Sequence, residues 1–162
     1  MASTTKIITA VTALESDGFD IDRTIEISEN AAGVEGSSMY LQKGEKISMR
    51  NLLYGLMLSS GNDAAVAIAE AVSGDETAFV ELMNKKVGEI GVADTHLSNP
   101  NGLPNDEHYS TAHDMAKITA YALRNPIFAE IVATKTHRID DSGAAYPRVI
   151  KNHNKLLSMY DG

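Results

Sequence analysis

Ser3 and Lys6 are the first residues of the chain whose types and spacing could carry chemistry. The apolar run that follows predicts a helix capped by Ser3, and residues three apart on a helix share a face. On that face the Lys6 amine could take the proton of the Ser3 hydroxyl, which is a weak nucleophile without a base. The unpaired N–H groups of a helix start also favour a developing negative charge. The pair indicates an acyl-transfer site, and the alternative is a capped amphipathic helix with a surface lysine.

A second polar stretch, Ser60-Gly61-Asn62, joins two apolar segments. A polar loop between buried helices is a common position for a functional site, and glycine permits a tight backbone there. The same tripeptide is also explained as helix-breaking punctuation in which Asn62 caps the next helix. By itself, this stretch leaves both interpretations open.

We expect helices to position these residues, because the apolar residues of the chain mostly recur at the spacing of one face of a helix. Ser48 is placed to cap a helix. Beyond the segment at the N-terminus, helices are expected over 49–58, 64–73, 76–90, from 110 or 111 to 125, and 126–132. Short strands are expected over 24–28, 37–41 and 136–139, turns over 43–46 and 141–143, and an ordered loop over 94–110. We therefore predict a mainly α chain with a few short strands, in which the helices over 49–58 and 64–73 are buried on most faces.

Composition excludes several classes of function. The length of 162 residues predicts one domain, and the net charge of -8 argues against nucleic-acid binding. Without cysteine, neither a disulfide nor a thiolate metal site can form. The five histidines show no ligand pair at helical spacing, so no metal and no cofactor are expected. No apolar run approaches the roughly 20 residues that cross a bilayer, and no signal peptide precedes Ser3.

The order of several motifs resembles that of the serine D-alanyl-D-alanine carboxypeptidases, the low-molecular-mass penicillin-binding proteins. The matching stretches are 2–7, 33–38, 52–57, 60–65 and 108–112. Glycine at position 61 suits these carboxypeptidases better than the related β-lactamases. The resemblance covers the whole chain, 1–162, as one partial DD-peptidase (transpeptidase-like) domain. It implies the helical lobe of the α/β β-lactamase and DD-peptidase-like fold, with most of the central sheet missing.

The resemblance implies a role for each of four residues. Ser3 would attack the carbonyl between two D-alanines and become an acyl-enzyme, with Lys6 as its general base. Ser60 would relay a proton toward the leaving D-alanine, and Asn62 would bind the substrate amide and help to hold Lys6. The implied partners are peptidoglycan stem peptides ending in D-alanyl-D-alanine and β-lactams, which would acylate Ser3 as substrate mimics.

The chain departs from the family pattern at the third motif, Lys-Thr-Gly. Its only Lys-Thr dipeptide, Lys135-Thr136, is followed by His137. The strands upstream of the nucleophile, the export signal and the membrane anchor of the family are also not seen. We therefore expect an internal piece, nearly or wholly inactive by itself, of an extracytoplasmic and membrane-associated enzyme. The alternatives are a non-catalytic module that binds stem peptides or β-lactams, and a helical fragment that self-associates through exposed apolar surface.

Overall fold

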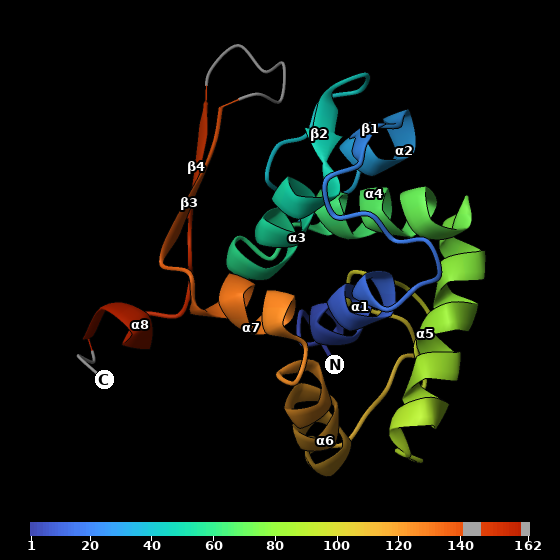
Figure 1. Cartoon of the computed structure of the whole chain (residues 1–162). Coiled ribbons are helices and arrows are strands. Elements are labelled where there is room, and N and C mark those ends of the chain that lie inside the picture. The colour runs from blue at the N-terminus through green and yellow to red at the C-terminus, as the bar shows by residue number, and fades with distance from the viewer. Residues whose placement is uncertain (141–146, 160–162) are drawn as a thin grey trace.

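The computed structural model describes residues 1–140 and 147–159, and this part of the chain is mainly helical, as predicted (Figure 1). The helices are α1 Thr5–Leu14, α2 Glu29–Ala32, α3 Met49–Leu58, α4 Asn62–Ser73, α5 Glu76–Ile90, α6 Ala112–Ala122, α7 Pro126–Ala133 and α8 Leu156–Met159. The strands are β1 Thr24–Glu26, β2 Lys46–Ser48, β3 Thr136–Ile139 and β4 Arg148–Lys151. None of the helices in the described ranges is long and apolar enough to cross a membrane.

Helix α1 packs against α3, α4, α5 and α6, so the helix that carries the candidate base lies inside the helical lobe (Figure 1). Ile8 and Val11 are fully buried, as an apolar face requires. The expected cap is wrong: the helix begins at Thr5, and Thr4 occupies the N-cap position without a side-chain hydrogen bond. The Ser3 hydroxyl is therefore not used to cap α1.

Helices α3 and α4 form the core next to α1 and pack against each other. Leu52 and Leu53 in α3 and Ile68 in α4 are fully buried, which confirms the prediction for these two helices. The Ser48 hydroxyl caps α3 by accepting a hydrogen bond from the Asn51 N–H at 3.2 Å, also as expected. Each fully buried leucine contributes roughly 1.5–3 kcal/mol of transfer free energy, so this pair helps to hold α3 in the core.

Two small antiparallel sheets flank the helices. Strand β1 pairs with β2, and β3 pairs with β4 as a long arm beside α3 (Figure 1). The β3–β4 arm is attached to α3 through His137, whose ring stacks on Tyr54 with centroids 3.7 Å apart. The His137 Nε2 atom also lies 2.8 Å from the Asn51 Oδ1 atom. Strand β3 matches the expected strand over 136–139, whereas its partner β4 was not predicted.

Several local expectations need correction. Residues 37–41 are not a strand but an irregular loop, which Asp63 holds through hydrogen bonds. The short elements α2, β2 and α8 were not predicted, and β2 begins at Lys46, inside the expected turn. Thr111, not Ser110, caps α6, by accepting from the Asp114 N–H. The turn expected over 141–143 lies outside the described residues.

Candidate active site

Lys6 and Ser3 meet at the start of α1. The Lys6 Nζ atom donates to the Ser3 Oγ atom at 3.3 Å, and the Lys6 N–H bonds to the Ser3 carbonyl at 3.1 Å across the turn that leads into α1. Ser3 is exposed, whereas only 1% of Lys6 is accessible to solvent. A buried amine is thus in contact with a hydroxyl that a substrate can reach.

Two further oxygens complete the surroundings of the Lys6 amine. Nζ donates to the Asn62 Oδ1 atom at 2.8 Å and to the Asn101 carbonyl oxygen at 2.6 Å. With Ser3, these acceptors match the three protons of a protonated amine. When Lys6 is neutral, its lone pair can accept a proton from Ser3. The two other neighbours are carbonyl oxygens, which carry no proton. Asn101 was not predicted as a site residue, because it contributes a backbone oxygen from an irregular loop.

The Ser60-Gly61-Asn62 loop places Asn62 next to Lys6. The Asn62 N–H donates to the Ser37 carbonyl at 2.7 Å, and its Nδ2 donates to the Glu35 carbonyl at 2.7 Å. These bonds fix the side-chain amide so that its oxygen faces the lysine. Asn62 is the first residue of α4 and its side chain does not cap that helix, so the capping interpretation is wrong.

Ser60 has an unusual conformation in this loop. Its φ of 58° lies in the left-handed region, which costs a non-glycine residue of order 1–3 kcal/mol. Its Oγ atom is buried and has no hydrogen-bond partner in the part of the chain that is described. A buried hydroxyl without a partner costs about 1–3 kcal/mol, so both the backbone and the side chain of Ser60 are in an unfavourable state.

Glycine is required at position 36, opposite Asn62. Gly36 has a φ of +91°, and a Cβ atom built there would lie 2.7 Å from the Asn62 Nδ2 atom. Any side chain at this position would therefore strain the backbone and push Asn62 away from Lys6. This explains why the matching stretch over 33–38 contains a glycine beside the site.

Burial makes Lys6 a usable base. Removal from water lowers the pKa of Lys6 from 10.5 to about 8, and the Asp63 carboxylate partly opposes that shift. Asp63 is itself buried and accepts hydrogen bonds from the Ser38 hydroxyl at 2.5 Å and from the Leu41 N–H at 3.0 Å. At neutral pH about one tenth of the Lys6 amines are therefore unprotonated, far more than for an exposed lysine.

The loop over 98–108 is bonded to α1 next to Lys6. The Thr9 hydroxyl donates to the Pro100 carbonyl at 2.6 Å, so two consecutive carbonyls of this loop, those of Pro100 and Asn101, are bonded to α1. Gly102 follows with a φ of +86°, and its Cα passes so close to α1 that an added Cβ would meet the Ala2 carbonyl oxygen. The loop is therefore pressed against the first turn of the helix.

Gly102→Ala is expected to destabilise the chain more than Gly44→Ala. Both glycines are left-handed, which alone costs an alanine about 1–2 kcal/mol, but nothing lies within 4 Å of a Cβ at Gly44. At Gly102 the clash with Ala2 adds about 1–3 kcal/mol of overpacking. Urea unfolding of the two variants would measure the difference. Equal midpoints would show that the loop does not press on α1.

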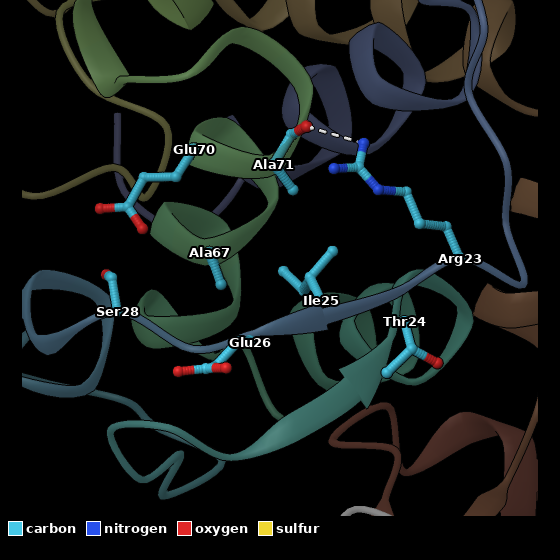
Figure 2. Close-up of a pocket in the computed structure, with 8 residues that line it drawn as sticks. All are labelled: Arg23, Thr24, Ile25, Glu26, Ser28, Ala67, Glu70 and Ala71. Carbon is cyan, nitrogen blue, oxygen red and sulfur yellow. Dashed lines mark hydrogen bonds between the residues drawn. The ribbon is translucent and has the colours of Figure 1, made fainter.

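One groove of the described structure lies away from Ser3 and Lys6. It has a volume of about 340 Å³ and runs between β1 and α4 (Figure 2). Figure 2 shows the Glu26 and Glu70 carboxylates along it and the Arg23 guanidinium, which donates to the Ala71 carbonyl at 3.3 Å. The Ser28 hydroxyl on its edge already caps α2. None of the four predicted catalytic residues lines this groove, and within residues 1–140 and 147–159 no cluster suited to a metal ion is found.

Two solved structures share this fold over almost the whole chain, a DD-transpeptidase and a D-alanyl-D-alanine carboxypeptidase. The Streptomyces K15 DD-transpeptidase matches 99% of this chain with a TM-score of 0.90 and 33% identity, over 67% of its own chain. The D-alanyl-D-alanine carboxypeptidase of Mycobacterium tuberculosis matches 99% of this chain with a TM-score of 0.90 and 34% identity, over 60% of its own chain.

The sequence model of the Peptidase_S11 family, described as D-alanyl-D-alanine carboxypeptidase, matches residues 1–161, and the chain belongs to this family. The D-alanyl-D-alanine carboxypeptidase DacF of Bacillus subtilis is 35% identical over 164 residues, which cover 99% of this chain and 42% of the relative. The chain thus spans less than half of that relative's length. The family resemblance expected from the sequence is confirmed, as is the assignment to the helical lobe of this fold.

Proposed function

We propose that this chain provides the nucleophile and general base of a serine D-alanyl-D-alanine carboxypeptidase, which removes the terminal D-alanine of peptidoglycan stem peptides. β-Lactams would acylate the same serine. The observation that carries the proposal is the buried Lys6 amine, bonded to Ser3 and Asn62, with a pKa of about 8. A peptidoglycan substrate puts the parent protein outside the cytoplasm, in the cell envelope, and we propose that the parent is membrane-associated.

In the acylation step, neutral Lys6 takes the proton of Ser3 as Oγ attacks the carbonyl carbon between the two D-alanines. The tetrahedral intermediate collapses by breaking the C–N bond. The proton held by Lys6 passes through the Ser60 hydroxyl to the leaving amine, which departs as D-alanine. Ser60 is proposed for this relay because it lies two residues before Asn62 in the chain and its Oγ atom has no hydrogen-bond partner among the described residues.

In the deacylation step, water replaces the leaving amine and Lys6 again takes the proton, now from water. The ester bond to Ser3 breaks, and the proton returns to the serine oxygen. Asn62 contributes through its Nδ2 group: one proton bonds to the Glu35 carbonyl, and the second is available for a substrate carbonyl. Every proton transfer is thus completed by two hydroxyls and one amine.

The acylation rate is expected to rise with pH and to reach half its maximum near pH 8. Only unprotonated Lys6 is a base, so between pH 6 and pH 7 the rate should increase about tenfold. The measurement is labelling by a fluorescent penicillin at several pH values, in a chain that carries these residues together with the family's Lys-Thr-Gly strand. A flat profile between pH 6 and pH 9 would exclude Lys6 as the base.

The 162-residue chain by itself is expected to be nearly inactive. In the family, the Lys-Thr-Gly strand would bind the substrate carboxylate and supply one oxyanion donor, and loss of one such donor typically costs about a hundred- to a thousandfold in rate. The assay is release of D-alanine from a peptide that ends in D-alanyl-D-alanine, beside a relative that has the strand. Turnover within tenfold of the relative would show that this chain needs no such strand.

A further inference from the structure

His108 connects the loop over 98–108 to the first turn of α1 and has no part in the chemistry proposed above. Its ring is buried, with 8% of the residue exposed. The Nε2 atom lies 2.8 Å from the Thr5 hydroxyl, and the Nδ1 atom lies 3.0 Å from the Ser98 backbone nitrogen. The His108 ring therefore bonds to two segments that hold Lys6. One is Thr5, which precedes Lys6 in the chain, and the other is Ser98, at the start of the loop whose Asn101 carbonyl bonds Lys6.

These contacts determine the protonation state of the ring. The Ser98 N–H can only donate, so Nδ1 must accept and carries no proton. In the neutral ring the proton is then on Nε2, which donates to the Thr5 oxygen. A protonated ring would place an N–H at Nδ1 against the Ser98 N–H, and the bond to the loop would be lost. The arrangement therefore requires a neutral His108 in a single tautomer.

The same loop holds one of the acceptors of Lys6. The Asn101 carbonyl bonds Nζ at 2.6 Å, and the neighbouring Pro100 carbonyl bonds Thr9. If the loop leaves α1, Lys6 loses this carbonyl and gains access to water. The position of His108 thus affects both the orientation of the amine and its burial, which is what lowers its pKa.

We propose that neutral His108 is a positioning residue that acts through Thr5 and the loop over 98–108 to keep Lys6 buried and aimed at Ser3. The expected effect on the acylation rate rests on the function proposed above, whereas the expected effect on the pKa of Lys6 does not. Because the two bonds need one tautomer, protonation of His108 at acidic pH would release the loop.

The surroundings of His108 favour the neutral ring. Burial is the main cause that lowers its pKa below 6.5, and the nearby ring of His96 lowers it further. The unfolded chain therefore binds a proton at a higher pH than the folded chain. The contribution of His108 to stability is complete above the unfolded value near 6.5 and is lost as the pH falls from there toward the folded value.

The matched variants are Thr5→Val, which removes the hydroxyl at nearly constant volume, and Thr5→Ser, which keeps it. The first test is NMR on the 162-residue chain. Long-range proton–nitrogen spectra of the histidine rings should show the Nε2–H tautomer for His108 at neutral pH. The Lys6 side-chain carbon shift, followed against pH, should give a pKa about one unit higher in Thr5→Val than in the unmodified chain, and an unchanged value in Thr5→Ser.

Catalysis provides the second test, in a chain that also carries the Lys-Thr-Gly strand. Thr5→Val should reduce the rate of penicillin acylation at pH 7 about tenfold, because a displacement of about 1 Å can cost up to about a hundredfold in rate. Thr5→Ser, which keeps the hydroxyl, should keep a rate within about threefold of the unmodified chain. A proton on Nδ1, or an identical Lys6 pKa in both variants, would overturn the positioning role. If the unmodified chain is not acylated at all, the proposed function fails, and the NMR result still decides the role of His108.

Discussion

Ser3→Ala is expected to abolish covalent labelling by penicillin in a chain that contains these residues and the Lys-Thr-Gly strand. An acyl-enzyme needs the serine oxygen, and loss of the nucleophile in a serine peptidase costs on the order of 10⁶ in rate. Ser3 is exposed and does not cap α1, so the substitution should leave the free energy of unfolding almost unchanged. Intact-mass spectrometry after incubation with the antibiotic measures the adduct.

Ser37→Ala is the matched control for this experiment. Ser37 is also an exposed serine beside the site, and it bonds Asn62 through its backbone carbonyl, which the substitution keeps. This variant should be labelled like the unmodified protein. The same adduct on Ser3→Ala would mean that another residue is the nucleophile, with Ser60 the first to examine because its hydroxyl is buried without a partner in the described structure.

Lys6→Met should lower the acylation rate by about a hundred- to ten-thousandfold, the usual range for loss of a general base. Methionine keeps most of the apolar stem in the core and removes only the amine. At pH 7 the folded chain holds Lys6 as a buried cation, whose pKa has fallen from 10.5 to about 8, a penalty of roughly 3 kcal/mol. The stabilisation gained by removing the buried cation should therefore offset the stability lost with its hydrogen bonds to Asn62 and Asn101.

The distinguishing measurement combines rate and stability. Lys6→Met should be nearly inactive while its urea midpoint stays equal to that of the unmodified chain or rises. Lys6→Ala, which also leaves a cavity, should be inactive and less stable by about 2–4 kcal/mol, by analogy with other large-to-small core substitutions. An acylation rate in Lys6→Met within tenfold of normal would contradict the assignment of the base.

Local sequence patterns predicted the helices well, because apolar spacing and caps act over a few residues. The expected bounds of α3 and α5 agree with the structure, and the Ser48 cap is where the pattern placed it. Residues 37–41 were mispredicted because a buried carboxylate, that of Asp63, satisfies their N–H groups in place of a partner strand. Hydrogen bonds to a residue more than 20 positions away do not affect the spacing of apolar residues, so the sequence pattern did not reveal them.

The candidate site was only partly visible for the same reason. Ser3, Lys6, Ser60 and Asn62 have diagnostic side chains, and the structure joins three of them, Ser3, Lys6 and Asn62, by hydrogen bonds to one amine. Asn101 acts through a backbone carbonyl, and any residue type could supply that oxygen. The Asn-Gly pair at 101–102 signalled only a turn, although Gly102 has to be glycine for the loop to approach α1.

We propose Ser3 as the nucleophile that Lys6 activates. To test this, a chain that keeps all of these residues and carries the Lys-Thr-Gly strand is treated with a penicillin at pH 8. The protein is then digested, and the adduct is located by fragmenting the peptides in a mass spectrometer. One acyl group is expected, on the oxygen of Ser3, in a peptide that does not contain Ser60. An adduct on Ser60 or on any other residue, with Ser3 unmodified, would contradict it.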